Sequence, residues 1–126
     1  MPLKIKIIGN RTPGKSEELK YRAVSVARGT TDLDELAEMV SDQTSMTKAD
    51  CYGVLIALEY NIINELRDGR IVQLGNIGNF QISVSSHTTD TKKEFKSSNI
   101  KSAKILYRPG KGFKKMLKSL SFKLIK

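Results

Sequence analysis

The segment that follows Thr47 constrains the fold of this chain more than any other part of the sequence. Apolar side chains recur there at helical spacing and form one continuous stripe: Val54, Leu55, Leu58, Ile62 and Leu66. Cys51, Ile56 and Ile63 widen this stripe. A face this wide is more than one neighbouring element can cover. The sequence therefore predicts a helix that is buried against more than one neighbour.

Capping signals set the ends of this helix and of a shorter one before it. Thr47 is an N-cap with a short acid three residues later, and the helix ends at Asp68-Gly69, where glycine can adopt the left-handed conformation. The shorter helix starts at Thr31 or Asp32 and has one apolar face, formed by Leu33, Leu36, Ala37 and Val40. The sequence thus predicts a two-helix hairpin over about 32–68.

Alternating apolar and polar residues predict strands on both sides of the helix pair. The expected strands cover 3–8, 21–27, 70–74, 80–85, 104–107 and 121–126. The first two form a hairpin around a turn at 12–16, and a glycine-rich bend at 75–79 joins the next two. The polar stretch 86–102 should protrude, and 113–120 should form a short helix. Helices and antiparallel strands in this order predict an α+β fold.

Positive charge is concentrated in the second half of the chain. The 126 residues carry a net charge of +9. Residues 1–70 hold 10 Lys/Arg and 11 Asp/Glu, a net of −1, whereas residues 71–126 hold 12 Lys/Arg and only Asp90 and Glu94, a net of +10. Such an asymmetry favours a polyanionic partner, whether nucleic acid, acidic membrane or acidic protein. The plainer alternative is a solvated lysine-rich surface.

Composition offers little material for catalysis or metal binding. One cysteine, Cys51, excludes an internal disulfide, and one histidine, His87, leaves few groups for acid–base or metal chemistry. We therefore expect no catalytic residues, no metal and no cofactor. No apolar run approaches the roughly 18 residues that cross a bilayer, and we find no secretory signal. The sequence predicts a cytoplasmic protein without a membrane partner or a small-molecule substrate.

Two sequence blocks resemble those of the bacterial histone-like HU and IHF family. The first is Asp68-Gly69-Arg70-Ile71-Val72-Gln73-Leu74-Gly75-Asn76-Ile77-Gly78-Asn79-Phe80, which is similar to the family's acid-Gly, strand and Gly-Phe-Gly-x-Phe signature. The second is Tyr107-Arg108-Pro109-Gly110-Lys111-Gly112-Phe113-Lys114, which is similar to its aromatic-Arg-Pro-Gly segment. Together with the helix pair and the polar excursion, the resemblance covers residues 31–120.

This resemblance implies an intertwined homodimer that binds and bends double-stranded DNA at the nucleoid. Its helices would form a common base, its strands a saddle, and its hairpin arms would reach around DNA. The implied dimer core comprises Val54, Leu55, Leu58, Ile62, Leu66 and Phe80. The implied DNA contacts on the arm are Lys92, Lys93, Lys96, Lys101 and Lys104. The implied DNA contacts on the body of the fold are Arg108, Lys111, Lys114, Lys115 and Lys118. Such contacts to phosphates carry little sequence preference.

The chain departs from the family pattern at three places. No proline lies between Phe80 and Arg108, where family arms carry a proline that wedges between base pairs; Phe95 is more readily explained by packing within the hairpin. Asn76 replaces the first glycine of the bend, and we expect it to adopt positive φ there. The additions divide the chain into an accessory hairpin at 1–30, the DNA-binding domain at 31–120 and a strand at 121–126 that pairs with the hairpin.

Several other functions fit the sequence less well than binding and bending of DNA. A helix-turn-helix over 32–67 is disfavoured because Asp50, Glu59 and Glu65 lie on its second helix. The bend 75–78 lacks the Gly-Lys-Ser/Thr ending of a phosphate loop. Binding to a membrane surface is disfavoured because the cations do not lie on a long amphipathic helix. The main alternative is a protein-interaction scaffold that kept the HU-like fold while DNA binding was reduced or lost.

Overall fold

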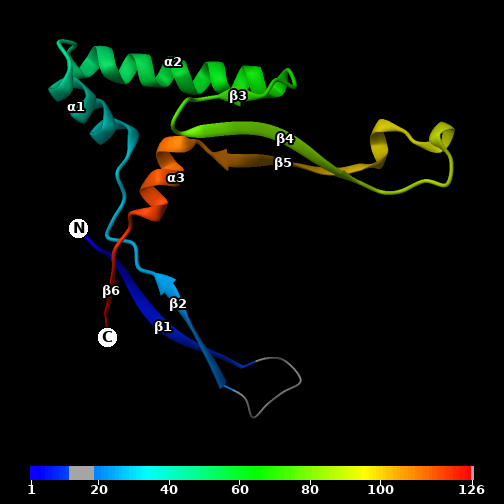
Figure 1. Ribbon diagram of the computed structural model, residues 1–126. Helices are drawn as coiled ribbons and strands as arrows, with labels where there is room; N and C mark the ends of the chain where they lie inside the picture. Colours follow the sequence, from blue (N-terminus) through cyan, green and yellow to red (C-terminus); the bar gives the residue numbers. More distant parts are fainter. Residues whose placement is uncertain (12–18, 126) are drawn as a thin grey trace. The chain divides into compact units, whose positions relative to one another are not determined.

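The computed structural model describes residues 1–11 and 19–125, so the turn predicted at 12–16 lies outside the described residues. Contacts between residues divide the chain into two compact units, whose elements are drawn in Figure 1. One unit comprises Met1–Asp32 and Met116–Lys126, and the other comprises Leu33–Lys115. Helices and two small antiparallel or mixed sheets make up these units, which confirms the predicted α+β class.

Two helices open the larger unit, α1 (Leu33–Gln43) and α2 (Lys48–Arg67), and they pack on each other. Thr47 caps α2, since its Oγ1 accepts a hydrogen bond of 3.1 Å from the backbone N–H of Asp50. Beyond Arg67, Gly69 takes a φ of 83°, which only glycine adopts without strain. The capping signals in the sequence thus set both ends of α2 as predicted.

A three-stranded antiparallel sheet follows, in the order β3-β4-β5. Its strands are β3 (Val72–Gln73), β4 (Gly78–Ser86) and β5 (Ile100–Pro109). β3 is shorter than predicted, and β5 starts four residues before the predicted strand. The extra residues of β5 pair with the end of β4, and their side chains are exposed. Backbone hydrogen bonding rather than an apolar pattern therefore extends this hairpin into the arm.

The end of the arm consists of two short 3₁₀ turns, η1 (Lys92–Glu94) and η2 (Ser97–Asn99). The backbone N–H of His87 donates a 2.8 Å hydrogen bond to the carbonyl of Asn99, which closes the loop beyond the paired strands. Within its unit, the arm extends well past the helices, as Figure 1 shows. The polar stretch 86–102 protrudes as predicted.

The two family-like sequence blocks dock against each other through backbone atoms. The N–H of Gly110 donates to the carbonyl of Ile77 (3.1 Å), and the N–H of Phe113 donates to the carbonyl of Asn76 (3.2 Å). A Cβ on Gly110 would collide with the carbonyl oxygen of Gly75 and lie 2.8 Å from Asn76 C and O. Helix α3 (Lys111–Lys118) starts at this junction, two residues earlier than predicted. Because the backbones of the two blocks lie so close together, position 110 requires glycine.

The prediction for Asn76 was wrong. Gly75 (φ 55°) and Gly78 (φ 135°) supply the left-handed conformations of the bend, and no non-glycine residue of the described chain has positive φ. The flanking glycines reverse the chain, so Asn76 keeps an ordinary backbone. Its carbonyl is instead the acceptor that holds the first turn of α3.

The smaller unit is built on a three-stranded sheet in the order β2-β1-β6. Its strands are β1 (Leu3–Arg11), β2 (Leu19–Ser25) and β6 (Phe122–Leu124). β1 pairs antiparallel with β2 and parallel with β6, with Leu3 opposite Phe122 and Ile5 opposite Leu124. The functional division at residues 30 and 120 stays a prediction.

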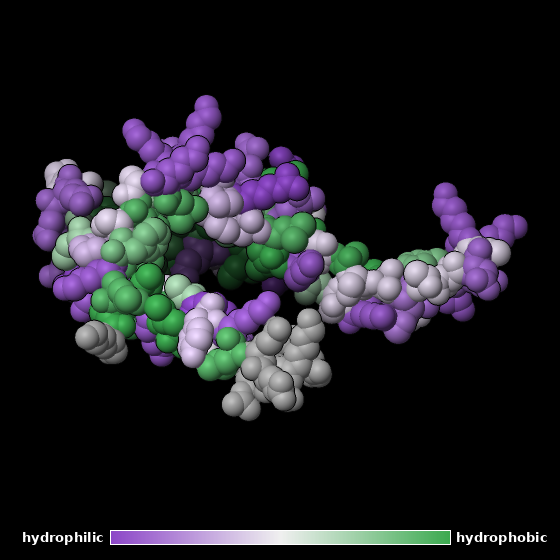
Figure 2. Space-filling view, turned by 60° about the horizontal axis from the view of Figure 1, so that its bottom comes forward, coloured by the Kyte–Doolittle hydropathy of each residue, from purple (hydrophilic) through white to green (hydrophobic). Residues whose placement is uncertain are grey.

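Few side chains of the described residues are enclosed by the chain itself. The buried apolar residues are Ala37, Cys51 and Leu66. On α2, by contrast, Val54 remains 55% exposed and Leu58 44% exposed. Figure 2 likewise shows hydrophobic residues open on the molecular surface. Apolar side chains of this kind normally form a core, so the wide stripe of α2 is not covered within one copy of the chain.

Candidate nucleic-acid interface

The β3-β4-β5 sheet has one apolar and one polar face. Side chains alternate along a strand, and residues directly opposite in an antiparallel pair share a face. Phe80 opposes Tyr107 with ring centroids 4.9 Å apart, and Ile82 opposes Ile105 on the same face. The residues between them form the other face, in the cross-strand pairs Asn79–Arg108, Gln81–Leu106, Ser83–Lys104 and Ser85–Ser102. The second face therefore carries amides, hydroxyls and two cations.

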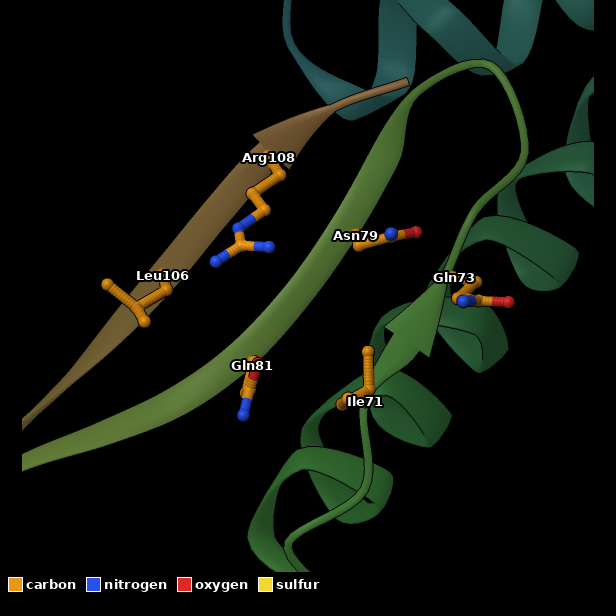
Figure 3. Close-up of a pocket in the computed structure, with 6 residues that line it drawn as sticks. All are labelled: Ile71, Gln73, Asn79, Gln81, Leu106 and Arg108. Atoms are coloured by element: carbon orange, nitrogen blue, oxygen red, sulfur yellow. The ribbon is translucent and has the colours of Figure 1, made fainter. Parts of the chain in front are cut away.

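A shallow hollow of about 120 Å³ lies on this polar face. It is lined by Ile71, Gln73, Asn79, Gln81, Leu106 and Arg108, which Figure 3 shows on the adjacent strands and the segment just before β3. Amides both donate and accept hydrogen bonds, and a guanidinium donates up to five. The hollow is smaller than the roughly 300–1,000 Å³ of small-molecule sites. This face is thus suited to contact with an extended polar surface.

Gln73, Asn79 and Gln81 were not predicted as site residues. They lie inside the first family-like block and carry no charge, so the charge pattern of the sequence does not indicate them. The signal that could have found them is strand alternation, because Phe80 fixes the apolar face and its neighbours must point the other way. Arg108 was predicted, and the structure places it beside Asn79.

The predicted arm cations fall into separate groups. Lys104 lies on the polar face of β5 with Arg108, whereas Lys101 lies at an irregularity in the pairing of β4 with β5, between Ile100 and Ser102. Lys92 and Lys93 are in η1, and Lys96 immediately precedes η2, so these three lie at the far end of the arm. The space-filling view shows the arm as a narrow and largely hydrophilic projection (Figure 2). The structure therefore separates Lys104 from the three lysines at the far end of the arm.

Four predicted cations form a stripe along α3. Lys111, Lys114, Lys115 and Lys118 occupy positions i, i+3, i+4 and i+7 of this helix, all exposed, and α3 contains no carboxylate. Two of them are in the first turn, where the helix dipole is itself positive and cations are disfavoured. A bound anion would remove this repulsion. The stripe therefore has the electrostatic character of a phosphate-binding surface.

None of the ten predicted cations is paired with a carboxylate within residues 1–11 and 19–125. The ion pairs found there join Lys48 to Asp34 and Arg70 to Glu65, each at 3.1 Å, and both involve α2 or its C-terminal flank. The cations of the arm, sheet and α3 thus keep their full charge for an external partner.

The six residues predicted as a dimer core differ in exposure. Leu66 is buried at 8% exposure, and Leu55, Ile62 and Phe80 are half-buried. Val54 and Leu58 are exposed on α2. Their role at a dimer interface stays a prediction.

The described part of the chain shows no cluster of three or more His, Cys, Asp or Glu side chains that could hold a metal ion. Cys51 is buried, and His87 lies at the base of the arm. Within the same described residues, no helix is long and apolar enough to cross a membrane.

A match to a known protein family shows to which family the chain belongs. A family model described as an HU domain fused to wHTH, Ig, or a glycine-rich motif, HU-HIG, matches residues 1–124. The chain belongs to this family. The HU-like resemblance is therefore confirmed, and the HU-HIG match includes the accessory strands as well as the region that carries the two sequence blocks. No curated protein matches the chain.

Two solved structures show the same fold. A candidate bacterial DNA-binding protein from Bacteroides vulgatus ATCC 8482 is similar over 98% of this chain, with a TM-score of 0.70 and 10% identity. This HU-HIG chain spans 48% of the length of that protein. Anabaena HU, in a cocrystal structure with DNA, is similar over 71% of this chain and 99% of its own length, with a TM-score of 0.54 and 23% identity. The predicted HU-like fold is confirmed.

Proposed function

We propose that this HU-HIG chain is a non-enzymatic, histone-like protein that binds duplex DNA through its phosphate backbone. The observation that carries the proposal is the set of ten cations on the arm, the polar sheet face and α3 that have no carboxylate partner in the part of the chain that the structure describes. Family membership and the HU–DNA cocrystal structure of a similar fold support the choice of DNA among polyanions. The protein would act at the nucleoid, with residues 31–120 as the DNA-binding domain.

Binding should show little sequence preference. Nine of the ten cations are lysines, and a lysine ammonium contacts phosphate as a point charge rather than reading a base edge. Arg108, with the amides of Asn79 and Gln81 around it, is the place where limited base contact can occur. Counterion release from the phosphates would supply most of the free energy of binding.

The protein acts as a homodimer in this proposal. One copy leaves Val54 and Leu58 of α2 exposed, and the apolar sheet face keeps Ile105 60% exposed. A second copy would cover these side chains, since obligate dimer interfaces resemble a domain core divided between two chains. The dimer would also present two arms, one from each copy.

Bending would come from wrapping rather than from a proline wedge. The arm contains no proline, and Phe95, which is exposed in part between the two 3₁₀ turns, is the aromatic residue nearest its tip. Phosphate contacts on the arm and on the body of the fold would pull the duplex against both surfaces, at a bending cost of about 1–6 kcal/mol for 40–90°. The gain in contacts must exceed this cost.

The scaffold alternative is supported by one specific observation. The accessory sheet carries an exposed apolar face, on which Tyr21 is 67% exposed and Phe122 61% exposed. Large exposed apolar patches mark protein-interaction surfaces. A scaffold would bind a protein partner there and show no salt-dependent affinity for DNA.

A pair of matched double variants tests the proposal. Lys104→Gln/Arg108→Gln removes both cations of the polar sheet face, whereas Lys48→Gln/Arg67→Gln removes two charges from α2. Fluorescence anisotropy with a labelled duplex should show that the first variant reduces the slope of log affinity against log salt by about 1.8. The control should keep the parent slope. Equal slopes in all three proteins would refute the sheet face as a DNA contact.

A further inference from the structure

The accessory sheet gathers its cations on one face, although they come from both ends of the sequence. Alternation along each strand places Lys4, Lys6, Lys20, Arg22 and Lys123 on the same side. The register fixes this grouping, since Lys4 is directly opposite Lys123, and Arg22 is opposite Ile8. The other side carries the apolar residues Leu3, Ile5, Ile7, Tyr21, Phe122 and Leu124.

Within the described residues, this basic face has no carboxylate counter-charge. β1, β2 and β6 contain no Asp or Glu, and the ion pairs found among the described residues involve none of these five cations. All five side chains are exposed. Like charges directly opposite each other across two strands are destabilising, as in the pair Lys4–Lys123. An anionic partner would turn this repulsion into a binding energy.

The basic character continues at one end of the sheet. A hollow of about 580 Å³ lies there, and its lining includes Lys4, Lys123 and Arg28 together with Leu3 and Leu120. The guanidinium of Arg28 donates a hydrogen bond to the sulfur of Met1 (3.3 Å) and has no carboxylate partner among the described residues. The surface available to an anion therefore extends from the face of the sheet into this concave end.

We propose that this face is a second phosphate-binding surface, and that it takes the backbone of duplex DNA. The inference deepens the proposed function: the chain would engage DNA through its accessory sheet as well as through the arm, the β3-β4-β5 sheet and α3. Five cations on a face without acid supply charge complementarity to a polyanion.

The arrangement favours DNA over an anionic membrane. A surface that binds lipid headgroups combines its cations with apolar side chains that enter the interface from the same side. Here the aromatic and most of the aliphatic side chains lie on the opposite face from the lysines. Nucleic-acid backbone, in contrast, needs cations and no apolar insertion.

The first test compares charge removal on this face with charge removal elsewhere. Lys6→Gln/Arg22→Gln should reduce the slope of log affinity against log salt by about 1.8, so between about 50 and 200 mM salt its affinity falls about tenfold less than that of the parent. Lys48→Gln/Arg67→Gln is the control with the same net charge. Circular dichroism establishes that each variant is folded.

Site-specific crosslinking tests the same surface without removing several charges. Cys51 is buried, so a photoreactive maleimide should label an introduced exposed cysteine. Arg22→Cys places the label on the basic face, and Ala23→Cys places it on the apolar face one residue away. Arg22→Cys should crosslink a 30-base-pair duplex, about three turns of DNA, several times more than Ala23→Cys.

The outcomes separate this inference from the proposed function. If the parent binds DNA with a steep salt dependence while Lys6→Gln/Arg22→Gln keeps the parent slope and both labels crosslink equally, the second surface is refuted and the proposed function stands. If the parent does not bind DNA at all, both fail. If the variant loses binding only to vesicles of phosphatidylserine and phosphatidylcholine, the face is a membrane surface and the inference is overturned.

Discussion

Replacing Gly110 by alanine should damage the junction that holds α3 on the sheet. The added Cβ would collide with the carbonyl oxygen of Gly75 and lie 2.8 Å from Asn76 C and O. These are backbone atoms, which cannot rotate away as a flexible side chain can. Gly110 itself has no positive φ, so the substitution adds overlap without adding conformational strain. The change in the free energy of unfolding therefore reports the steric overlap with the backbone of Gly75 and Asn76 alone.

The loss of stability can be estimated from the contacts that the added Cβ would push apart. Overpacking a tight contact costs about 1–3 kcal/mol. The shift would also weaken the hydrogen bonds from Gly110 N–H to Ile77 and from Phe113 N–H to Asn76, each worth about 1 kcal/mol. We expect a loss of about 2–4 kcal/mol in the free energy of unfolding. Gly69→Ala is the matched control: it has positive φ and no atom within 4 Å of the added Cβ, so it should cost only about 1–2 kcal/mol.

Urea unfolding followed by circular dichroism at 222 nm measures both variants. Protein concentration must be equal in every sample, because the stability of a dimer depends on it. The expected order of stability is parent, Gly69→Ala and then Gly110→Ala. If Gly110→Ala is as stable as the parent, or more stable than Gly69→Ala, the two sequence blocks do not depend on close backbone docking and the reasoning is wrong.

Three further predictions concern the helix cap, the dimer and the arm. Thr47→Ala should lower the free energy of unfolding by about 1 kcal/mol through loss of the bond to Asp50, and Thr47→Ser should keep most of it; an unchanged urea midpoint for the alanine variant would contradict the cap. Leu58→Glu should weaken the dimer at least about tenfold in sedimentation equilibrium, and an unaltered dimer would exclude this face of α2. Phe95→Ala should leave the bend angle unchanged in fluorescence energy transfer across a bound duplex, whereas a straighter duplex would identify Phe95 as a wedge.

Local signals in the sequence were enough to predict the helix pair. The cap at Thr47, the apolar period and the stop at Gly69 lie within one segment, and each depends on neighbours along the chain, so α2 was predicted with its ends. β5 was predicted too short because its first residues, Ile100-Lys101-Ser102-Ala103, do not alternate regularly between apolar and polar and are held by pairing with β4 rather than by burial. An alternating apolar pattern marks a strand with one buried face, so it cannot indicate a strand whose two faces are both exposed.

Grouping of side chains in space was predicted less well. Lys92, Lys93 and Lys104 were assigned together as arm contacts, yet Lys104 lies on the polar face of β5 and the other two lie in η1 at the far end of the arm. The last strand was predicted to pair with the N-terminal hairpin, but the parallel register that sets Lys4 opposite Lys123 was not predicted. The charge count of the two halves therefore missed the basic face of the accessory sheet. The alternating pattern of the last strand indicated that it would pair with the hairpin, but it did not indicate the direction or the register of the pairing.

The central claim is that this chain binds duplex DNA by neutralising phosphates. The measurement that tests it most directly is the affinity of the parent protein for a labelled duplex of about thirty base pairs, from about 50 to 200 mM salt. If six or more of the ten predicted cations contact phosphates, log affinity should fall linearly with log salt, by about 10³-fold or more across this range. Absence of binding at the lowest salt, or binding that does not change with salt, would contradict the claim and favour the scaffold alternative.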